Sequence, residues 1–134
     1  DPASVAPAPG LVVGDMSFIS LTLVLPALVG AAAPDADFLL MVKPQFEIGK
    51  ERLGHGGVVR NPEHHVETVD NVARCAMGLG LDIAAIAASP LPGPSGNVEY
   101  FLFMRRAYPD PIKADELTDY IRRAVAEGPA GRKS

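Results

Sequence analysis

Three charged residues stand where predicted strands begin or end. Asp15 and Lys43 each follow a short apolar run, and Glu99 lies near the start of a third run. In an open α/β sheet, ligands bind outside the carboxyl ends of the parallel strands, and an antiparallel strand begins at that same edge. We therefore expect Asp15, Lys43 and Glu99 to converge at one rim of the sheet. There they would form either a structural ion pair or a group that moves or orients a proton.

The apolar pattern predicts four strands and three helices that position these residues. Continuous apolar runs indicate strands at 11–13, 38–42, 81–88 and 98–104, and helical spacing indicates helices at about 21–33, 61–78 and 112–127. Asn61 and Pro62 are typical of a helix start, as N-cap and first helical residue. Alternating strands and helices indicate a mostly parallel α/β sheet. Because the turn at 89–97 is too short for a crossover, the last two strands are expected to pair antiparallel.

Basic residues gather in a glycine-rich loop that the pattern predicts at residues 44–61. They can bind phosphates together with two arginines that follow the last strand, or they can simply face solvent. The residues in question are Lys50, Arg52, Arg60, Arg105 and Arg106. Because acidic residues are interspersed with them, the two interpretations carry about equal weight.

Composition excludes several classes of function. The 134 residues carry a formal net charge of −4, which argues against a generally basic nucleic-acid-binding surface. The single cysteine, Cys75, excludes an internal disulfide framework and a cysteine-based zinc site. His64 and His65 are adjacent on a predicted helix, so they do not share a face as metal ligands four residues apart would, and we expect surface histidines.

A charge-free run at residues 16–34 raises the question of a membrane span. Polar residues and Pro26 interrupt the run and no lysine or arginine flanks it, so it predicts a buried helix bent near Pro26 and no stable membrane insertion. The chain starts without methionine and without a secretory signal. We expect a fragment that begins partway through a fold, with residues 1–10 as a leader outside the core.

Three segments in order resemble the TlyA family of bacterial ribosomal-RNA ribose 2′-O-methyltransferases, whose members are also called hemolysins. They are residues 15–21 (DMSFISL), 42–47 (VKPQFE) and 90–102 (PLPGPSGNVEYFL). The resemblance implies the C-terminal half of a Rossmann-like, FtsJ-like methyltransferase sheet, with residues 11–106 as matched core and 107–134 as terminal helix and tail. It also implies S-adenosylmethionine as cofactor, cytidine in ribosomal RNA or a ribosomal subunit as substrate, and a cytoplasmic location.

The resemblance assigns catalytic roles to the rim residues. The family's tetrad is Lys-Asp-Lys-Glu, and its last three members fall on Asp15, Lys43 and Glu99, with Asp15 also expected to contact the cofactor. Lys43 would act as a base, or as the donor that orients a ribose 2′-hydroxyl for in-line transfer. The first lysine, the cofactor's glycine-rich loop, the family's S4-type RNA-binding domain and the rest of the N-terminal half have no counterpart. This chain alone is therefore expected to be inactive.

Three further residues are expected to contact the target nucleotide. Phe18, three residues after Asp15, would stack on the base, or it would be a core residue beside the following helix. Ser95 and Asn97 flank Glu99 and would hydrogen-bond the base, or they would stabilise the turn, a role slightly favoured for Asn97. Two other functions remain as alternatives: a membrane-active hemolysin-like protein, and a truncated remnant without catalytic activity.

Overall fold

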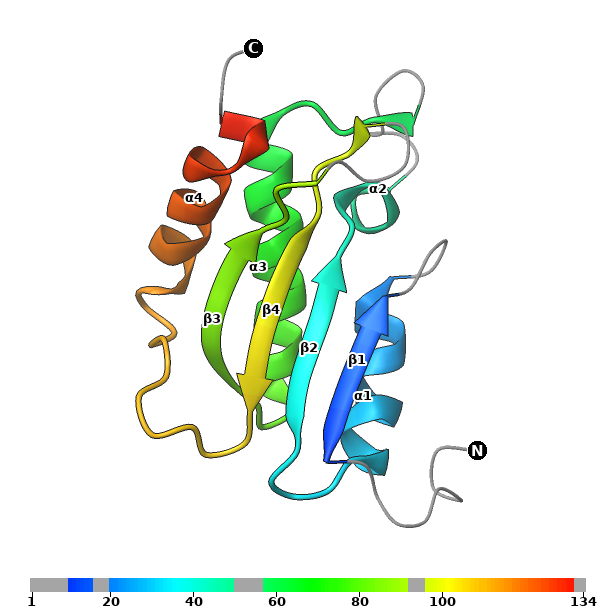
Figure 1. The fold of residues 1–134 in the computed structure, drawn as a ribbon, viewed down its shortest axis with the longest axis vertical. Helices are drawn as coiled ribbons and strands as arrows, with labels where there is room; N and C mark the ends of the chain where they lie inside the picture. The colour runs from blue at the N-terminus through cyan, green and yellow to red at the C-terminus, as the bar shows by residue number, and fades with distance from the viewer. Residues whose placement is uncertain (1–9, 16–19, 50–56, 92–95, 132–134) are drawn as a thin grey trace.

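The computed structural model describes residues 10–15, 20–49, 57–91 and 96–131 of the chain (Figure 1). Strands and helices follow one another in the predicted order, with two additional short elements, a four-residue helix and a 3₁₀ helix. In chain order they are β1 (Leu11–Asp15), α1 (Leu21–Ala31), β2 (Asp37–Val42), α2 (Pro44–Glu47), α3 (Pro62–Gly78), β3 (Asp82–Ala88), β4 (Tyr100–Arg105), α4 (Leu117–Glu127) and a 3₁₀ helix (Pro129–Gly131).

The four strands form one sheet in the order β1-β2-β4-β3. β1 and β2 are parallel, and β4 runs antiparallel to both of its neighbours. The predicted mixed sheet with a terminal antiparallel pair is therefore confirmed. Because β4 lies between β2 and β3, its first residue, Tyr100, pairs with the last residue of β2, Val42. The start of β4 thus meets the end of β2 at one edge of the sheet.

The two faces of the sheet differ in what covers them. Helices α1 and α3 lie on one face of the sheet (Figure 1). Phe38, Leu40 and Leu102 belong to the same core cluster as the buried residues of these helices, and all three are at most 1% exposed. The alternate residues point the other way, as period-two geometry requires. Among these, Leu11 and Val13 on β1 remain exposed. The hydrophobic core therefore lies between the sheet and one layer of helices.

The helix starts follow the capping rules. The Ser20 side chain accepts a hydrogen bond from the Thr22 amide at the start of α1, and Asn61 caps α3 in the same way with Pro62 as its first residue. The Asn61–Pro62 prediction is thereby confirmed. The charge-free run forms α1 with Pro26 inside it, and Leu21 and Leu25 are buried in the core. Within the described ranges, none of the helices has the length and apolarity needed to cross a membrane.

Two predicted boundaries are wrong. The loop expected at 44–61 begins with a helical turn, α2, because Pro44 is well suited to the first helical position. The last helix begins at Leu117 and not near Ile112. Ile112 is buried, and its amide donates to the Ile83 carbonyl oxygen at 2.9 Å, so this residue serves the core from an extended segment. On α4 the buried face includes Val125, whereas Tyr120 is 41% exposed.

Candidate active site

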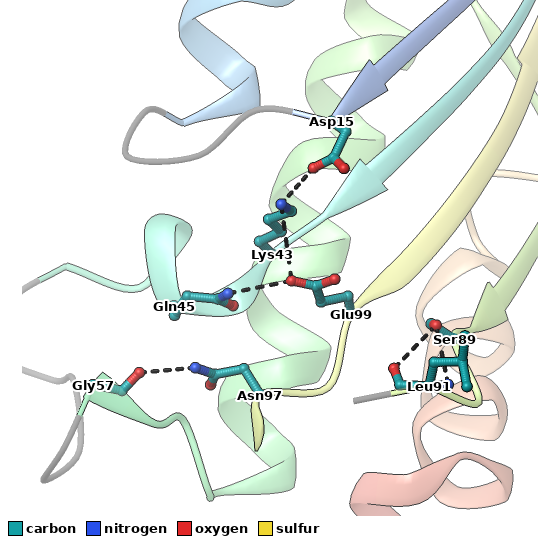
Figure 2. Close-up of polar contacts among 8 residues, drawn as sticks. All are labelled: Asp15, Lys43, Gln45, Gly57, Ser89, Leu91, Asn97 and Glu99. Carbon is teal, nitrogen blue, oxygen red and sulfur yellow. Dashed lines mark hydrogen bonds and ion pairs between the residues drawn. The ribbon is translucent and has the colours of Figure 1, made fainter. Parts of the chain in front are cut away.

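Four polar side chains gather where β1 and β2 end and β4 begins, and we call them the rim cluster: Asp15, Lys43, Gln45 and Glu99 (Figure 2). Lys43 follows β2 and Glu99 precedes β4, so the pairing of those strands brings the two together. The Lys43 Nζ forms an ion pair with the Asp15 carboxylate and lies 4.0 Å from Glu99 Oε2. The convergence expected from topology is confirmed, while the catalytic roles of these residues stay predictions.

The rim cluster is unevenly buried. Lys43 and Glu99 are 7% and 6% exposed, whereas the Asp15 side chain is 57% exposed. Charges at such depth persist in proteins when they are paired, because an isolated buried charge is costly. The arrangement presents one ammonium between a carboxylate that faces solvent and a carboxylate that does not.

Gln45 was not expected in this cluster. α2 places it beside Glu99, and its Nε2 donates to Glu99 Oε2 at 3.4 Å (Figure 2). Its Oε1 is buried and has no hydrogen-bond partner among the residues that the structure describes. In the sequence, the feature that could have indicated Gln45 is its position two residues after Lys43, in a segment that resembles the TlyA family.

Glu47, also in that segment, holds the start of α1. One carboxylate oxygen accepts from the Ser20 hydroxyl at 2.5 Å and the other accepts from the Leu21 amide at 2.8 Å. Burial raises the pKa of Glu47, and the hydrogen bonds from Ser20 and Leu21 partly oppose that rise. Lys43 and Glu47 therefore fasten both the end of β1 and the start of α1 to one short turn.

A second buried polar group lies next to the rim cluster, and we call it the loop clamp: His65, Asn97 and Tyr100. Asn97 Oδ1 accepts from the Val59 amide, and its Nδ2 donates to the Gly57 carbonyl oxygen, each at 2.9 Å (Figure 2 shows the second contact). Both polar atoms of this side chain thus have protein partners. This observation agrees with a structural role, and substrate binding by Asn97 stays a prediction.

His65 holds the same loop from the other side. Its Nε2 lies 2.7 Å from the Val59 carbonyl oxygen, which only accepts, so Nε2 carries the proton. The Nδ1 atom then accepts from the Tyr100 hydroxyl at 2.7 Å. The expectation of a surface histidine is wrong for His65, which is 1% exposed. Its ring serves two buried hydrogen bonds, a pairing that depends on residues distant in sequence.

Apart from Arg60, which lies in the described segment before α3, the other predicted site residues fall into two groups. Phe18, Ser95, Lys50 and Arg52 lie outside the described residues. Arg105 and Arg106 lie at the opposite end of the sheet from the rim cluster, where Arg105 pairs with Asp37 at 2.6 Å. Arg106 donates to the carbonyl oxygens of Val29 and Ala33 at 2.7 and 2.9 Å, near the end of α1. These two arginines are therefore not placed to bind phosphates together with the rim.

Metal binding finds no support in the part of the chain that the structure covers. No group of three or more histidine, cysteine, aspartate or glutamate side chains there is arranged to hold an ion. The chemistry available at the rim is instead that of an ammonium, two carboxylates and an amide, which suits hydrogen bonding and proton transfer.

Comparison with known proteins also indicates a methyltransferase. A family model described as FtsJ-like methyltransferase matches residues 3–106. The chain is 55% identical over 119 residues to the 16S/23S rRNA (cytidine-2'-O)-methyltransferase TlyA of Mycobacterium tuberculosis, and this match covers 89% of the chain but 44% of that relative. The chain therefore spans less than half the length of the curated relative that it matches.

Two solved structures share the fold. A hemolysin-named protein from Streptococcus thermophilus is 29% identical, with a TM-score of 0.79, over 95% of this chain and 46% of that one. A SAM-dependent methyltransferase from Methanosarcina mazei is 14% identical, with a TM-score of 0.53, over 79% of this chain and 64% of that one, a likeness of fold alone. The expected methyltransferase-like sheet is confirmed.

Proposed function

This chain belongs to the FtsJ-like methyltransferase family, and from that premise we propose that it forms part of an S-adenosylmethionine-dependent enzyme that methylates a ribose 2′-hydroxyl in ribosomal RNA. The observation that carries the proposal is the rim cluster, in which Lys43 lies between Asp15 and Glu99. The name of the M. tuberculosis relative supports cytidine as the target nucleotide. An enzyme that methylates ribosomal RNA would be located in the cytoplasm.

The residues at the rim fit the needs of the cofactor. S-adenosylmethionine supplies, when bound, a methyl group on a positively charged sulfur. The Asp15 carboxylate is half-exposed and carries the charge that attracts a cation. Asp15 would thus contribute to holding the cofactor while it also holds Lys43. We propose residues 11–106 as the methyltransferase part and 107–134 as an added helix and tail.

Lys43 is the residue best placed to act on the ribose hydroxyl. A 2′-hydroxyl is a weak nucleophile, so transfer requires its oxygen to be aligned and its proton to be removed. Two carboxylates within 4.0 Å attract the ammonium form of Lys43. Of the two roles, the geometry therefore favours that in which the Lys43 ammonium donates a hydrogen bond and orients the ribose oxygen. Taking up the hydroxyl proton would require Lys43 to be neutral first.

The test is transfer of labelled methyl from S-adenosylmethionine to unmodified ribosomal RNA by the complete native protein. Lys43→Ala is expected to reduce kcat/KM by about 10²- to 10⁴-fold, the range for a positioned proton-transfer group. Arg74→Ala is the control, because it removes a cation from an exposed ion pair with Asp70. Near-native transfer by Lys43→Ala would refute the assigned role. A folded native protein that binds the cofactor and transfers no methyl would refute the proposed function.

A further inference from the structure

Among the described residues, the terminal amide of Gln45 has a hydrogen-bond partner for its NH₂ group but none for its oxygen. The Gln45 residue is 8% exposed and lies within the rim cluster (Figure 2). Its orientation is fixed by Glu99, because a carboxylate accepts hydrogen bonds and therefore requires the NH₂ group to face it at 3.4 Å. The carbonyl oxygen is thereby turned away from Glu99, and it has no hydrogen-bond partner within the described part of the chain.

Such an atom is unusual in a folded protein. Nearly all buried polar atoms have partners, and one that has none costs free energy because its hydration is lost without replacement. The neighbouring Asn97 shows the ordinary case, since both of its polar atoms are bonded to backbone groups. A buried acceptor that lacks a partner and lies beside two buried charges lowers stability. Such a costly arrangement is typical of a group that binds a ligand.

We propose that Gln45 is a ligand-contacting residue of the rim, whose carbonyl oxygen accepts a hydrogen bond from an N–H or O–H group of the bound nucleotide or cofactor. The proposal rests on the proposed function. Because the oxygen is shielded from bulk water, the donor belongs to a group that is itself enclosed at the rim. The NH₂ group of the same side chain keeps its contact with Glu99, so Gln45 also links ligand binding to the position of that carboxylate.

Gln45→Met tests the proposal in the complete native protein, because methionine matches the length of glutamine and has no amide. The control is Thr68→Val, which removes a buried hydroxyl that does have a partner, the His65 carbonyl oxygen at 3.0 Å. Three quantities are measured: the Tm of the free protein, the Kd for S-adenosylhomocysteine, and the Kd for unmodified ribosomal RNA. None of these requires turnover.

We expect Gln45→Met to leave Tm unchanged or higher while one Kd rises roughly tenfold, the effect of one lost hydrogen bond. A rise in the S-adenosylhomocysteine Kd assigns the donor to the cofactor, and a rise in the RNA Kd assigns it to the nucleotide. A lower Tm with both Kd values unchanged, as expected for Thr68→Val, would overturn the proposal.

The outcome also separates this proposal from the proposed function. A native protein that transfers no methyl, yet whose cofactor Kd depends on Gln45, would refute the function and keep the ligand contact. Native methyl transfer with both Kd values and Tm unchanged in Gln45→Met would keep the function and refute the contact.

Discussion

The rim cluster and the loop clamp lie side by side at one end of the sheet, and both are built from buried polar residues. In the loop clamp, the side-chain polar atoms of His65 and Asn97 all have partners, and the group carries no formal charge when His65 is neutral. In the rim cluster, Lys43 and Glu99 are charged, Asp15 is half-exposed and Gln45 Oε1 lacks a partner among the described residues.

This difference separates two uses of buried polar groups. A network whose members are all satisfied stabilises one arrangement of the chain, whereas an incomplete one costs stability. The loop clamp fixes the backbone at Gly57 and Val59. The rim cluster, by contrast, combines charge with a buried acceptor that has no partner among the described residues, the combination that we propose for ligand binding.

Among the variants that compare the two regions, the largest effect is expected from Glu99→Gln, which removes a charge from the rim while it keeps the shape of the side chain. Methyl transfer by the complete native protein is expected to fall about a hundredfold or more. Stability should change by less than about 1 kcal/mol, because an amide oxygen can still accept from Gln45. Glu63→Gln, the same change in an exposed ion pair with Arg122, serves as control. Large loss of stability with normal transfer would reverse the contrast between the two regions.

A loss of stability without a comparable loss of transfer is expected from Tyr100→Phe in the loop clamp. This change removes the hydroxyl that donates to His65 Nδ1 and leaves a buried acceptor unsatisfied. The free energy of unfolding should fall by about 1–3 kcal/mol, measured by urea denaturation. Tyr120→Phe is the matched control, because Tyr120 is exposed. Equal free energies of unfolding in the two variants would show that the hydrogen bond between Tyr100 and His65 does not stabilise the fold.

The smallest effect is a pH dependence of stability that originates in His65. Burial lowers the pKa of His65 from its ordinary 6.5, so the unfolded chain takes up the proton at a higher pH than the folded chain does. The free energy of unfolding should therefore decrease as the pH falls below about 6.5. Denaturation midpoints across this range should show the decrease in the native protein and in His64→Gln. His65→Gln should lack it, and a decrease of the same size in that variant would assign the effect to other groups.

Topology-level features of this protein are predictable from its sequence, and distant side-chain partners are not. The convergence of Asp15, Lys43 and Glu99 follows from where strands end, and the start of α3 follows from Asn61 and Pro62. The roles of the remaining residues depend on contacts across long stretches of chain.

His65 illustrates the limit, because it meets Tyr100 across 35 residues, and nothing near His65 in the sequence indicates that partner. For Gln45 and Glu47, the sequence gives no indication beyond their place in segment 42–47, which resembles the TlyA family. Their contacts arise because β4 is inserted beside β2 and because α2 folds against the start of α1.

The position of β4 has a consequence for the order of folding events. β4, the last of the described strands, occupies an interior place in the sheet, and its pairing with β2 brings Glu99 to Gln45 across 54 residues. Contacts of such separation form slowly, because closing a long loop costs chain entropy before the contact stabilises it. A polypeptide still emerging from the ribosome lacks Glu99 at the rim until β4 has inserted beside β2. The rim is thus assembled together with the sheet, because Lys43 and Glu99 meet only when β2 and β4 pair.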